Sequence, residues 1–394
     1  MSLSEGTGGS SSLESVALGE VLTFFGMVAD YAAGSAPESG ERVASLAAGM
    51  AKIAGLAQEE TDSLYFAARL RNIGALGNAA FAKGSPLSPR ETMMQRWDVP
   101  AAGSRLCERI AALPKTTADI LRWQAECWDG TGYPDQLRWS GIPVAAQLLH
   151  IASTYVARED PEDALTAITM ESGRTYAPEQ ARTFTMWFHT FGGEIESAAP
   201  PANALDGQRT PVMSLIECLS ERVDAHNGAP GRAGRIAGLA QAIAKQLGCD
   251  ADACQQTRLA ALLFAIGELR ATELESLQFD ALARLGIETR AEHAVTAARL
   301  AAQCPYLSEI APVLRARAEW YDGTGAPDRL RHDAIPPPAH VLAASIAYDA
   351  LDEAHRSRIA EERALPIARL ETASGTQFDP RLVRAVTEVA KVRA

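Results

Sequence analysis

The residues of this sequence that are best suited to chemistry lie in and around a ten-residue stretch that occurs twice. The stretch reads WDGTGYPDQL at residues 128–137 and YDGTGAPDRL at residues 321–330. A glutamate precedes each copy, at Glu126 and Glu319. Two interpretations of these glutamates are open: a carboxylate that supports a reactive site, or a hydrogen-bond partner for the turn that follows. The second is favoured, because polar side chains readily bond to nearby backbone groups in turns.

The repeated stretch predicts a tight glycine loop between two helices. Two glycines around a threonine suit a turn with positive φ, and the proline after them fixes the exit of the chain. The aspartate that opens each loop is expected to accept backbone N–H groups of the loop itself. The loop residues are Asp129, Gly130, Gly132, Tyr133 and Pro134 in the first copy, and Asp322, Gly323, Gly325 and Pro327 in the second.

Three arginines form another group that could act chemically. Arg69, Arg71 and Arg96 could build an anion-binding pocket for a phosphate or nucleotide, because guanidinium groups bind phosphate through paired hydrogen bonds. The favoured alternative is that they pair with acidic neighbours such as Glu59 or Asp62. No nucleophile triad, P-loop or dinucleotide-binding loop is visible. The six cysteines include no C-x-x-C pair, which is typical of small buried side chains in a reduced compartment.

The elements that hold these residues are predicted to be helices. Alanine, leucine, arginine and glutamate dominate the sequence, and apolar residues recur at helical spacing. Residues 81–100 carry several turn residues and are expected to be a looser stretch. The order of elements repeats at an offset of 193 residues (322 − 129), with RVASLA at 42–47 matched by RIAGLA at 235–240. The predicted fold class is therefore all-α, with two tandem helical bundles related by an internal repeat.

A break in the helical pattern sets the predicted domain limits. Glycine, alanine and proline interrupt the periodicity after residue 191. We expect a flexible Ser/Gly-rich tail at 1–14, a first domain at 15–192, a linker at 193–210 and a second domain at 211–394.

Charge and hydropathy exclude several classes of partner. The 394-residue chain has a formal net charge of −12, which disfavours binding to a nucleic acid polymer. It has no apolar run of membrane-spanning length, and its N-terminus lacks the basic and apolar regions of a signal peptide. A cytoplasmic protein without a membrane span is expected.

The order of the motifs resembles the HD-GYP family, a branch of the HD superfamily of helical metal-dependent phosphohydrolases. The resemblance rests on Arg-Val in a helix, then L-x-x-I-G, then E-x-x-D-G-T-G-Y-P, then I-P, and it covers roughly residues 33–191 and 228–392. The D-G-x-G-Y-P loop is highly specific for this family. The resemblance implies helix bundles in which two or three metal ions support the hydrolysis of cyclic di-GMP.

The positions at which the family carries its metal ligands hold other residues here. In the first copy these positions are Ser39, Arg71, Asn72, Gln124 and Ser153, with Glu126 kept, Ala75 at the expected lysine, and Val99 or Pro100 at a central histidine. In the second copy they are Arg232, Phe264, Ala265, Arg317 and Ile346, with Glu319 kept, Glu268 at the expected lysine, and His293 at the central histidine. A single imidazole cannot hold a di-metal centre, and arginines repel divalent cations. We therefore expect no bound metal and no cofactor, and we interpret His293 as a partly buried structural histidine.

These departures favour the hypothesis of a catalytically degenerate signalling protein, a binding or scaffolding module in cyclic di-GMP signalling. One alternative is a residual metal-dependent phosphodiesterase with an unconventional site, acting on cyclic di-GMP. Another is a structural unit that forms a homodimer. The resemblance also implies a possible protein partner, a diguanylate cyclase (GGDEF) domain, contacted through the GYP loop that is complete only in the first copy.

Overall fold

The computed structural model describes residues 8–77, 88–201, 204–205, 210–270, 283–357 and 366–393. The chain divides into two compact units. Among the described residues, those up to Leu215 belong to unit 1 and those from Ile216 onward belong to unit 2. The change of unit falls inside the helix α10, close to the start of the second domain predicted from the sequence.

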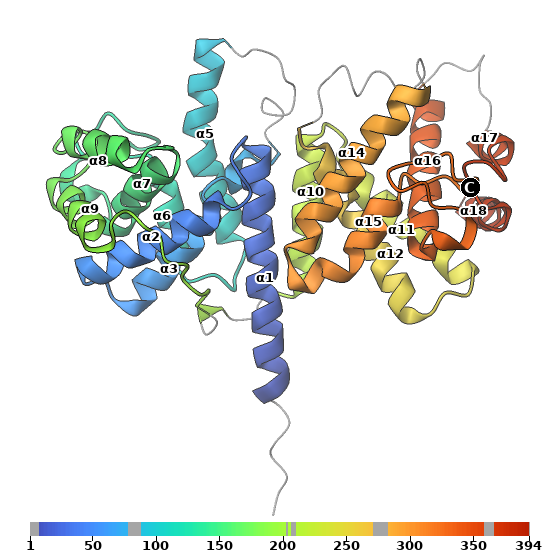
Figure 1. The fold of residues 1–394 in the computed structure, drawn as a ribbon, viewed down its shortest axis with the longest axis horizontal. Helices are drawn as coiled ribbons and strands as arrows, with labels where there is room; N and C mark the ends of the chain where they lie inside the picture. Colours follow the sequence, from blue (N-terminus) through green and yellow to red (C-terminus); the bar gives the residue numbers. More distant parts are fainter. Residues whose placement is uncertain are drawn as a thin grey trace, which may run out of the picture. The chain divides into compact units, whose positions relative to one another are not determined.

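Unit 1 is built from helices and short 3-10 turns (Figure 1). Its elements are α1 (Gly8–Ala32), α2 (Ser39–Ala54), α3 (Gln58–Arg69), η1 (Ile73–Ala75), α5 (Pro89–Glu108), α6 (Thr117–Arg122), η2 (Trp139–Gly141), α7 (Val144–Val156), α8 (Pro161–Met170) and α9 (Pro178–Phe191).

Unit 2 repeats this order of elements (Figure 1). Its elements are α10 (Val212–His226), α11 (Arg232–Gln246), α12 (Ala251–Leu263), η4 (Phe264–Glu268), α14 (Ala283–Ala302), η5 (Pro305–Ile310), α15 (Ala311–Ala316), η6 (His332–Ala334), α16 (Pro337–Ser357), α17 (Pro366–Thr372) and α18 (Pro380–Arg393). The predicted all-α fold with two tandem helical bundles is confirmed, and no β-strand occurs in the described part of the chain.

The two units pack their helices in the same way. In unit 1, α2 packs against α3, α7 and α9, and in unit 2 the corresponding α11 packs against α12, α16 and α18. The central helix buries the same face in both units: Val43, Leu46, Ala47 and Met50 of α2, and Ile236, Leu239, Ala240 and Ile243 of α11. Each pair is related by the 193-residue offset (236 − 43). The repeat in the sequence is thus a repeat of buried helix faces, since burial of apolar side chains drives this packing.

The glycine of each Ile-Gly motif lets a 3-10 turn lie directly on a long helix. A β-carbon added to Gly74 would overlap the carbonyl oxygen of Val99 on α5. A β-carbon on Gly267 would overlap the carbonyl oxygen of His293 on α14 in the same way. Backbone atoms cannot move aside as a flexible side chain can, so only glycine suits these two positions. The equivalence also identifies Val99, rather than Pro100, as the counterpart of His293.

Two local predictions were wrong. Residues 8–14 of the predicted flexible tail are helical, because α1 begins at Gly8; extending a helix that is already packed costs less than nucleating a new one. Part of the predicted loose stretch 81–100 belongs to α5, which begins at Pro89. A capping box starts this helix: the backbone N–H of Glu91 donates to Ser88 while the Glu91 carboxylate accepts from the Ser88 backbone. Residues 1–7 and 78–87 lie outside the described residues.

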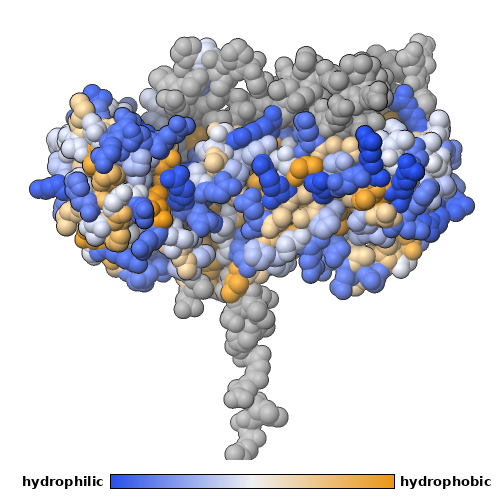
Figure 2. All heavy atoms as spheres, viewed as in Figure 1, coloured by the Kyte–Doolittle hydropathy of each residue, from blue (hydrophilic) through white to orange (hydrophobic). Residues whose placement is uncertain are grey.

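Part of the segment predicted as a linker lies on unit 1. The backbone N–H of Ala198 donates to Ser45 Oγ at 3.0 Å, and Ser197 Oγ donates to the Glu41 carboxylate at 3.0 Å. On the face shown in Figure 2, hydrophobic residues occur in small groups between hydrophilic ones. Among the described helices, none has both the length and the apolar character needed to cross a bilayer.

Candidate functional site

The two glycine loops have the same hydrogen bonds. Glu126 accepts the backbone N–H groups of Asp135 at 2.7 Å and Leu137 at 3.0 Å. Glu319 accepts those of Asp328 at 2.6 Å and Leu330 at 3.2 Å. Both glutamates are buried. They therefore act as turn partners, as the favoured interpretation states, although they bond to the far end of the loop and not to its Asp-Gly start.

The first aspartate of each loop folds the loop itself, as predicted. Asp129 accepts from the backbone N–H and the hydroxyl of Thr131 at 2.9 and 2.6 Å. Asp322 does the same with Thr324 at 2.9 and 2.7 Å. These bonds to the charged form lower the pKa of Asp129. Asp129 is thus committed to the turn.

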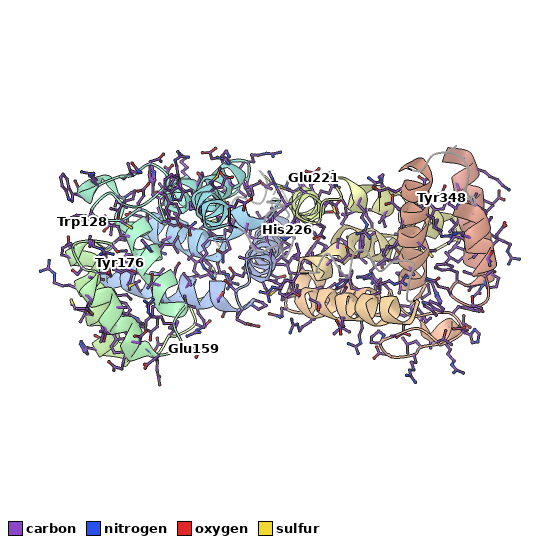
Figure 3. The ribbon with its side chains drawn as sticks, turned by 90° about the horizontal axis from the view of Figure 1, so that it is seen from above. Trp128, Glu159, Tyr176, Glu221, His226 and Tyr348 are labelled. Carbon is purple, nitrogen blue, oxygen red and sulfur yellow. The ribbon has the colours of Figure 1, made fainter. Side chains whose placement is uncertain are left out.

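Each loop is also attached to the segment before the last helix of its unit. The Trp128 N–H donates to the Thr175 carbonyl at 3.1 Å, and the neighbouring Tyr176 ring packs edge-on against His150, with 5.2 Å between ring centroids. Trp128 and Tyr176 are labelled in Figure 3. In unit 2, the Tyr321 N–H donates to the Gln377 carbonyl at 3.2 Å. The start of each loop is therefore fixed to the segment before the last helix of its unit.

The predicted positive φ occurs at only one glycine of each loop. Gly130 has φ 83° and Gly323 has φ 81°, whereas Gly132 and Gly325 do not adopt positive φ. The second glycines are needed for a different reason. A β-carbon on Gly132 would overlap the backbone of Glu126 and Cys127, where the loop folds back on itself.

Replacing Gly132 by valine is expected to destabilise unit 1 more than replacing Thr131 by alanine. The valine would overlap backbone atoms, at a cost of about 1–3 kcal/mol, whereas Thr131 loses one exposed hydrogen bond, worth about 1 kcal/mol or less. Urea unfolding of the two variants measures the difference. Equal unfolding midpoints would show that the loop tolerates a side chain at Gly132.

The ligand positions of unit 1 are filled by a buried polar cluster around Asp30. The Arg71 guanidinium lies 3.1 Å from the Asp30 carboxylate, Asn72 Nδ2 donates to it at 2.8 Å, and Ser39 Oγ donates to it at 3.3 Å. Arg71 also donates to Ser39 Oγ at 2.8 Å. Gln124 donates to the Arg71 carbonyl at 3.1 Å. Four of the predicted vestigial positions therefore meet in one network.

Asp30 forms the centre of this network and was not among the residues predicted from the sequence. Its side chain is fully buried, and burial raises its pKa, while Arg71, Asn72, the Gly40 N–H and Ser39 act in the opposite direction. The family pattern assigns no role to the last turn of α1, so only a lone acidic residue in an apolar helix face marked it.

The structure does not support an anion pocket at the arginines of unit 1. Arg71 is paired with Asp30, and Arg69 lies 3.6 Å from Glu41. Pairing with acidic side chains is therefore what occurs, but with partners other than Glu59 and Asp62. The side chain of Arg96 lies outside the described residues.

The ligand positions of unit 2 hold a cluster rich in arginine. Arg232 donates to Glu268 at 2.7 Å, and Arg317 lies 3.9 Å from the same carboxylate. Both guanidinium groups lie over the buried Phe264 ring, at 4.9 and 5.5 Å from its centroid. Such contacts are attractive for a cation over an aromatic face. Phe264 thus stands where the family carries a metal-ligating histidine, and its ring stabilises two positive charges through cation–π contacts.

The Arg317 side chain is buried without full hydrogen bonding. It is 5% exposed, and its Nε and Nη2 atoms have no hydrogen-bond partner in the part of the chain that the structure describes. Burial lowers the pKa of Arg317 to about 10; Glu268 acts against this, whereas the positive charges of Arg232 and Arg290 add to it. The side chain is nevertheless cationic near neutral pH. Buried guanidinium N–H groups without acceptors are unusual and costly.

Asp224 is the counterpart of Asp30 in unit 2. Its carboxylate accepts the Ala233 N–H at 2.7 Å. Asp30 accepts the N–H of Gly40, and Gly40 and Ala233 are related by the 193-residue offset (233 − 40). Among the described residues no guanidinium bonds to it, and its Oδ1 atom has no hydrogen-bond partner there. The two units therefore place the same buried carboxylate beside their ligand positions but satisfy it differently.

The remaining positions add little that could hold a metal. The Ser153 hydroxyl is buried without a hydrogen-bond partner, the Ala265 carbonyl accepts from Asn227 at 3.2 Å, and His293 is half-buried on α14. Within the described residues, no three His, Cys, Asp or Glu side chains group as metal ligands would. Guanidinium groups at Arg71, Arg232 and Arg317 are donors and cannot coordinate a cation. The residues present do not suit the metal ions that the resemblance implies.

The chain resembles cyclic dinucleotide phosphodiesterases in sequence. It is 27% identical over 176 residues to a cyclic di-GMP phosphodiesterase of Thermotoga maritima, covering 42% of this chain and 48% of that protein. It is 28% identical over 119 residues to a 3'3'-cGAMP-specific phosphodiesterase of Vibrio cholerae, covering 30% of this chain and 23% of that protein. The matches thus span half or less of these curated relatives.

A solved structure shares the fold of the whole chain. It is a cyclic GMP-AMP specific phosphodiesterase of Vibrio cholerae, which superposes with a TM-score of 0.66 at 18% sequence identity, covering 95% of this chain and 98% of that one. The family model of the HD domain matches residues 26–176 and again residues 215–382. The two matched segments correspond to the two helical units, and this chain therefore belongs to the HD domain family.

Proposed function

We propose that this protein binds a cyclic dinucleotide without hydrolysing it and acts as a signalling module. The observation that carries the proposal is the presence of two arginines in unit 2, Arg232 and Arg317, at positions where the resemblance places metal ligands. Arg71 stands at such a position in unit 1, but it is already paired with Asp30. An arginine can hold a phosphate group by charge and hydrogen bonds. It supplies no ligand for the metal ions that this family uses.

Hydrolysis of a phosphodiester needs more than a bound phosphate. The attacking water must be activated, which metal ions do by lowering the pKa of bound water. The Asp30 carboxylate is occupied by Arg71 and Asn72, so it is not available as a base. The Glu126 and Glu319 carboxylates are bound to loop N–H groups. Binding without turnover therefore suits these residues best.

The sequence relatives favour a cyclic dinucleotide as the ligand, and they also favour a rival function, hydrolysis of that ligand. Their names describe phosphodiesterases acting on cyclic di-GMP and 3'3'-cGAMP. A cyclic dinucleotide is accordingly the first ligand to test. The rival function is a residual metal-dependent phosphodiesterase whose active site lies outside the positions described above.

Cyclic di-GMP and 3'3'-cGAMP are expected to stay intact when incubated with this protein and Mn²⁺ or Mg²⁺. Chromatography detects the linear product, titration calorimetry measures binding, and elemental analysis of the purified protein is expected to find no stoichiometric Fe, Mn or Zn. Turnover that a chelator abolishes contradicts the proposal. Turnover that also survives Arg71→Ala and Glu126→Ala would support the rival function.

The proposed protein partners stay predictions. A GGDEF domain would contact the complete GYP loop of unit 1, where the Tyr133 ring stacks on the partly exposed Trp97 with 6.1 Å between centroids. A homodimer is the other prediction. Co-purification with a diguanylate cyclase domain and light scattering of the isolated protein test these two in turn.

A further inference from the structure

We infer that the arginine cluster of unit 2 is an anion site, which takes a phosphate group where this family's metal ions would lie. The cluster is defined as Arg232 and Arg317, around Phe264 and Glu268. The inference rests on the proposed function only for the identity of the ligand, a cyclic dinucleotide. The site itself depends on contacts among the described residues.

The charge of Arg317 is only partly compensated. Among the described residues, Glu268 is the one carboxylate that acts on it, at 3.9 Å, and the same carboxylate accepts from Arg232 at 2.7 Å. Unit 1 is different, because the single guanidinium of Arg71 is matched by the single carboxylate of Asp30 at 3.1 Å. An excess of buried positive charge is unfavourable unless an anion compensates it.

Unused hydrogen-bond donors point to where that anion binds. Arg317 is 5% exposed, and its Nε and Nη2 atoms have no hydrogen-bond partner among the described residues. The separation of 3.9 Å between Arg317 and Glu268 is too long for a hydrogen bond. Two adjacent N–H donors of one guanidinium match two oxygens of a phosphate group. Arg317 is thus prepared for a bidentate acceptor that the described residues do not provide.

The Arg232 and Glu268 side of the cluster lies nearer to solvent than Arg317 does. The Arg232 and Glu268 side chains are each 19% exposed, whereas Arg317 lies deeper. Glu268 accepts from Arg232 at 2.7 Å and so takes the place of an external anion. A phosphate group that binds to Arg317 must compete with this carboxylate. Glu268 is therefore expected to weaken binding, and its removal to strengthen it.

The test compares Arg317→Gln and Glu268→Gln with two matched surface changes on α14, Arg299→Gln and Glu292→Gln. Both control side chains are exposed. Cyclic di-GMP and inorganic pyrophosphate are the probes, measured by titration calorimetry at one ionic strength. Because a charge-assisted hydrogen bond contributes a factor of roughly ten or more, Arg317→Gln is expected to weaken binding at least tenfold. Glu268→Gln is expected to strengthen it, and the controls to change it less than about twofold.

The outcomes separate the site from the proposed function. If Arg317→Gln binds both probes as the Arg299→Gln control does, the inferred site is wrong, even if cyclic di-GMP binds elsewhere. If pyrophosphate binding depends on Arg317 but cyclic di-GMP does not bind, the site stands and the ligand of the proposed function is wrong. If the Arg317 variant fails to unfold cooperatively, and so is not folded, the Glu268→Gln variant provides the test. If its affinity for the two probes is no greater than that of the Glu292→Gln control, the inferred site is wrong.

Discussion

Replacing Arg71 by methionine is expected to destabilise unit 1 by about 3–5 kcal/mol, because it leaves the Asp30 carboxylate buried without its counter-charge. Asp30 is fully buried, and Arg71 is its only cationic partner among the described residues. Asn72 and Ser39 would still donate hydrogen bonds, but neither neutralises the charge. The Asp30 side chain must then take up a proton or draw water into the core.

Urea unfolding followed by circular dichroism measures this loss. The matched control is Arg158→Met, which removes an exposed ion pair with Asp163 at 3.3 Å and is expected to cost less than about 1 kcal/mol. The double change Asp30→Leu with Arg71→Met removes both charges and is expected to recover much of the stability. Equal midpoints for Arg71→Met and Arg158→Met would contradict the role given to this pair.

Replacing Asp224 by asparagine is expected to stabilise unit 2 above neutral pH. Burial raises the pKa of Asp224 from 3.8 to about 6, against the opposing effects of the Ala233 N–H, Arg232 and Arg235, while Glu268 adds to the rise. A shift of this size corresponds to about 3 kcal/mol. Screening near the partly exposed Arg235 reduces this to on the order of 1–2 kcal/mol. Asparagine keeps an acceptor for Ala233 without the buried charge.

The sign of the pH dependence follows from the raised pKa. The folded state takes up the proton near pH 6 and the unfolded state only near pH 4, so this group favours folding fully below pH 3.8 and loses that contribution as the pH rises through 6. The stability gained by Asp224→Asn should therefore be large at pH 8 and small at pH 4.5. Glu292→Gln, on the exposed face of α14, serves as the control. A gain that does not change with pH would show that Asp224 titrates normally.

The repeat and its helical nature could be predicted from the sequence because both depend on local patterns. The buried faces of α2 and α11 follow from apolar residues at helical spacing, and the 193-residue offset carries that face from Val43 to Ile236. The loops were also predictable, since Asp129 and Thr131 are close in sequence and bond to each other. The sequence pattern predicted a positive φ at both glycines of each loop, but Gly132 is needed because its backbone lies against that of Glu126 and Cys127. A sequence cannot separate these two reasons, because both favour glycine.

Which charged groups meet in each bundle was decided by tertiary structure alone. Asp30 and Arg71 are 41 residues apart, and no pattern in the sequence around either residue indicates the pair. Other ligand positions of unit 2 hold Arg232 and Arg317, whose residue types were evident from the sequence. The sequence therefore determined that the ligand positions carry arginines in both units. Only packing, which brings a carboxylate to Arg71 and leaves two donors of Arg317 without an acceptor, distinguishes a filled site from one open to an anion.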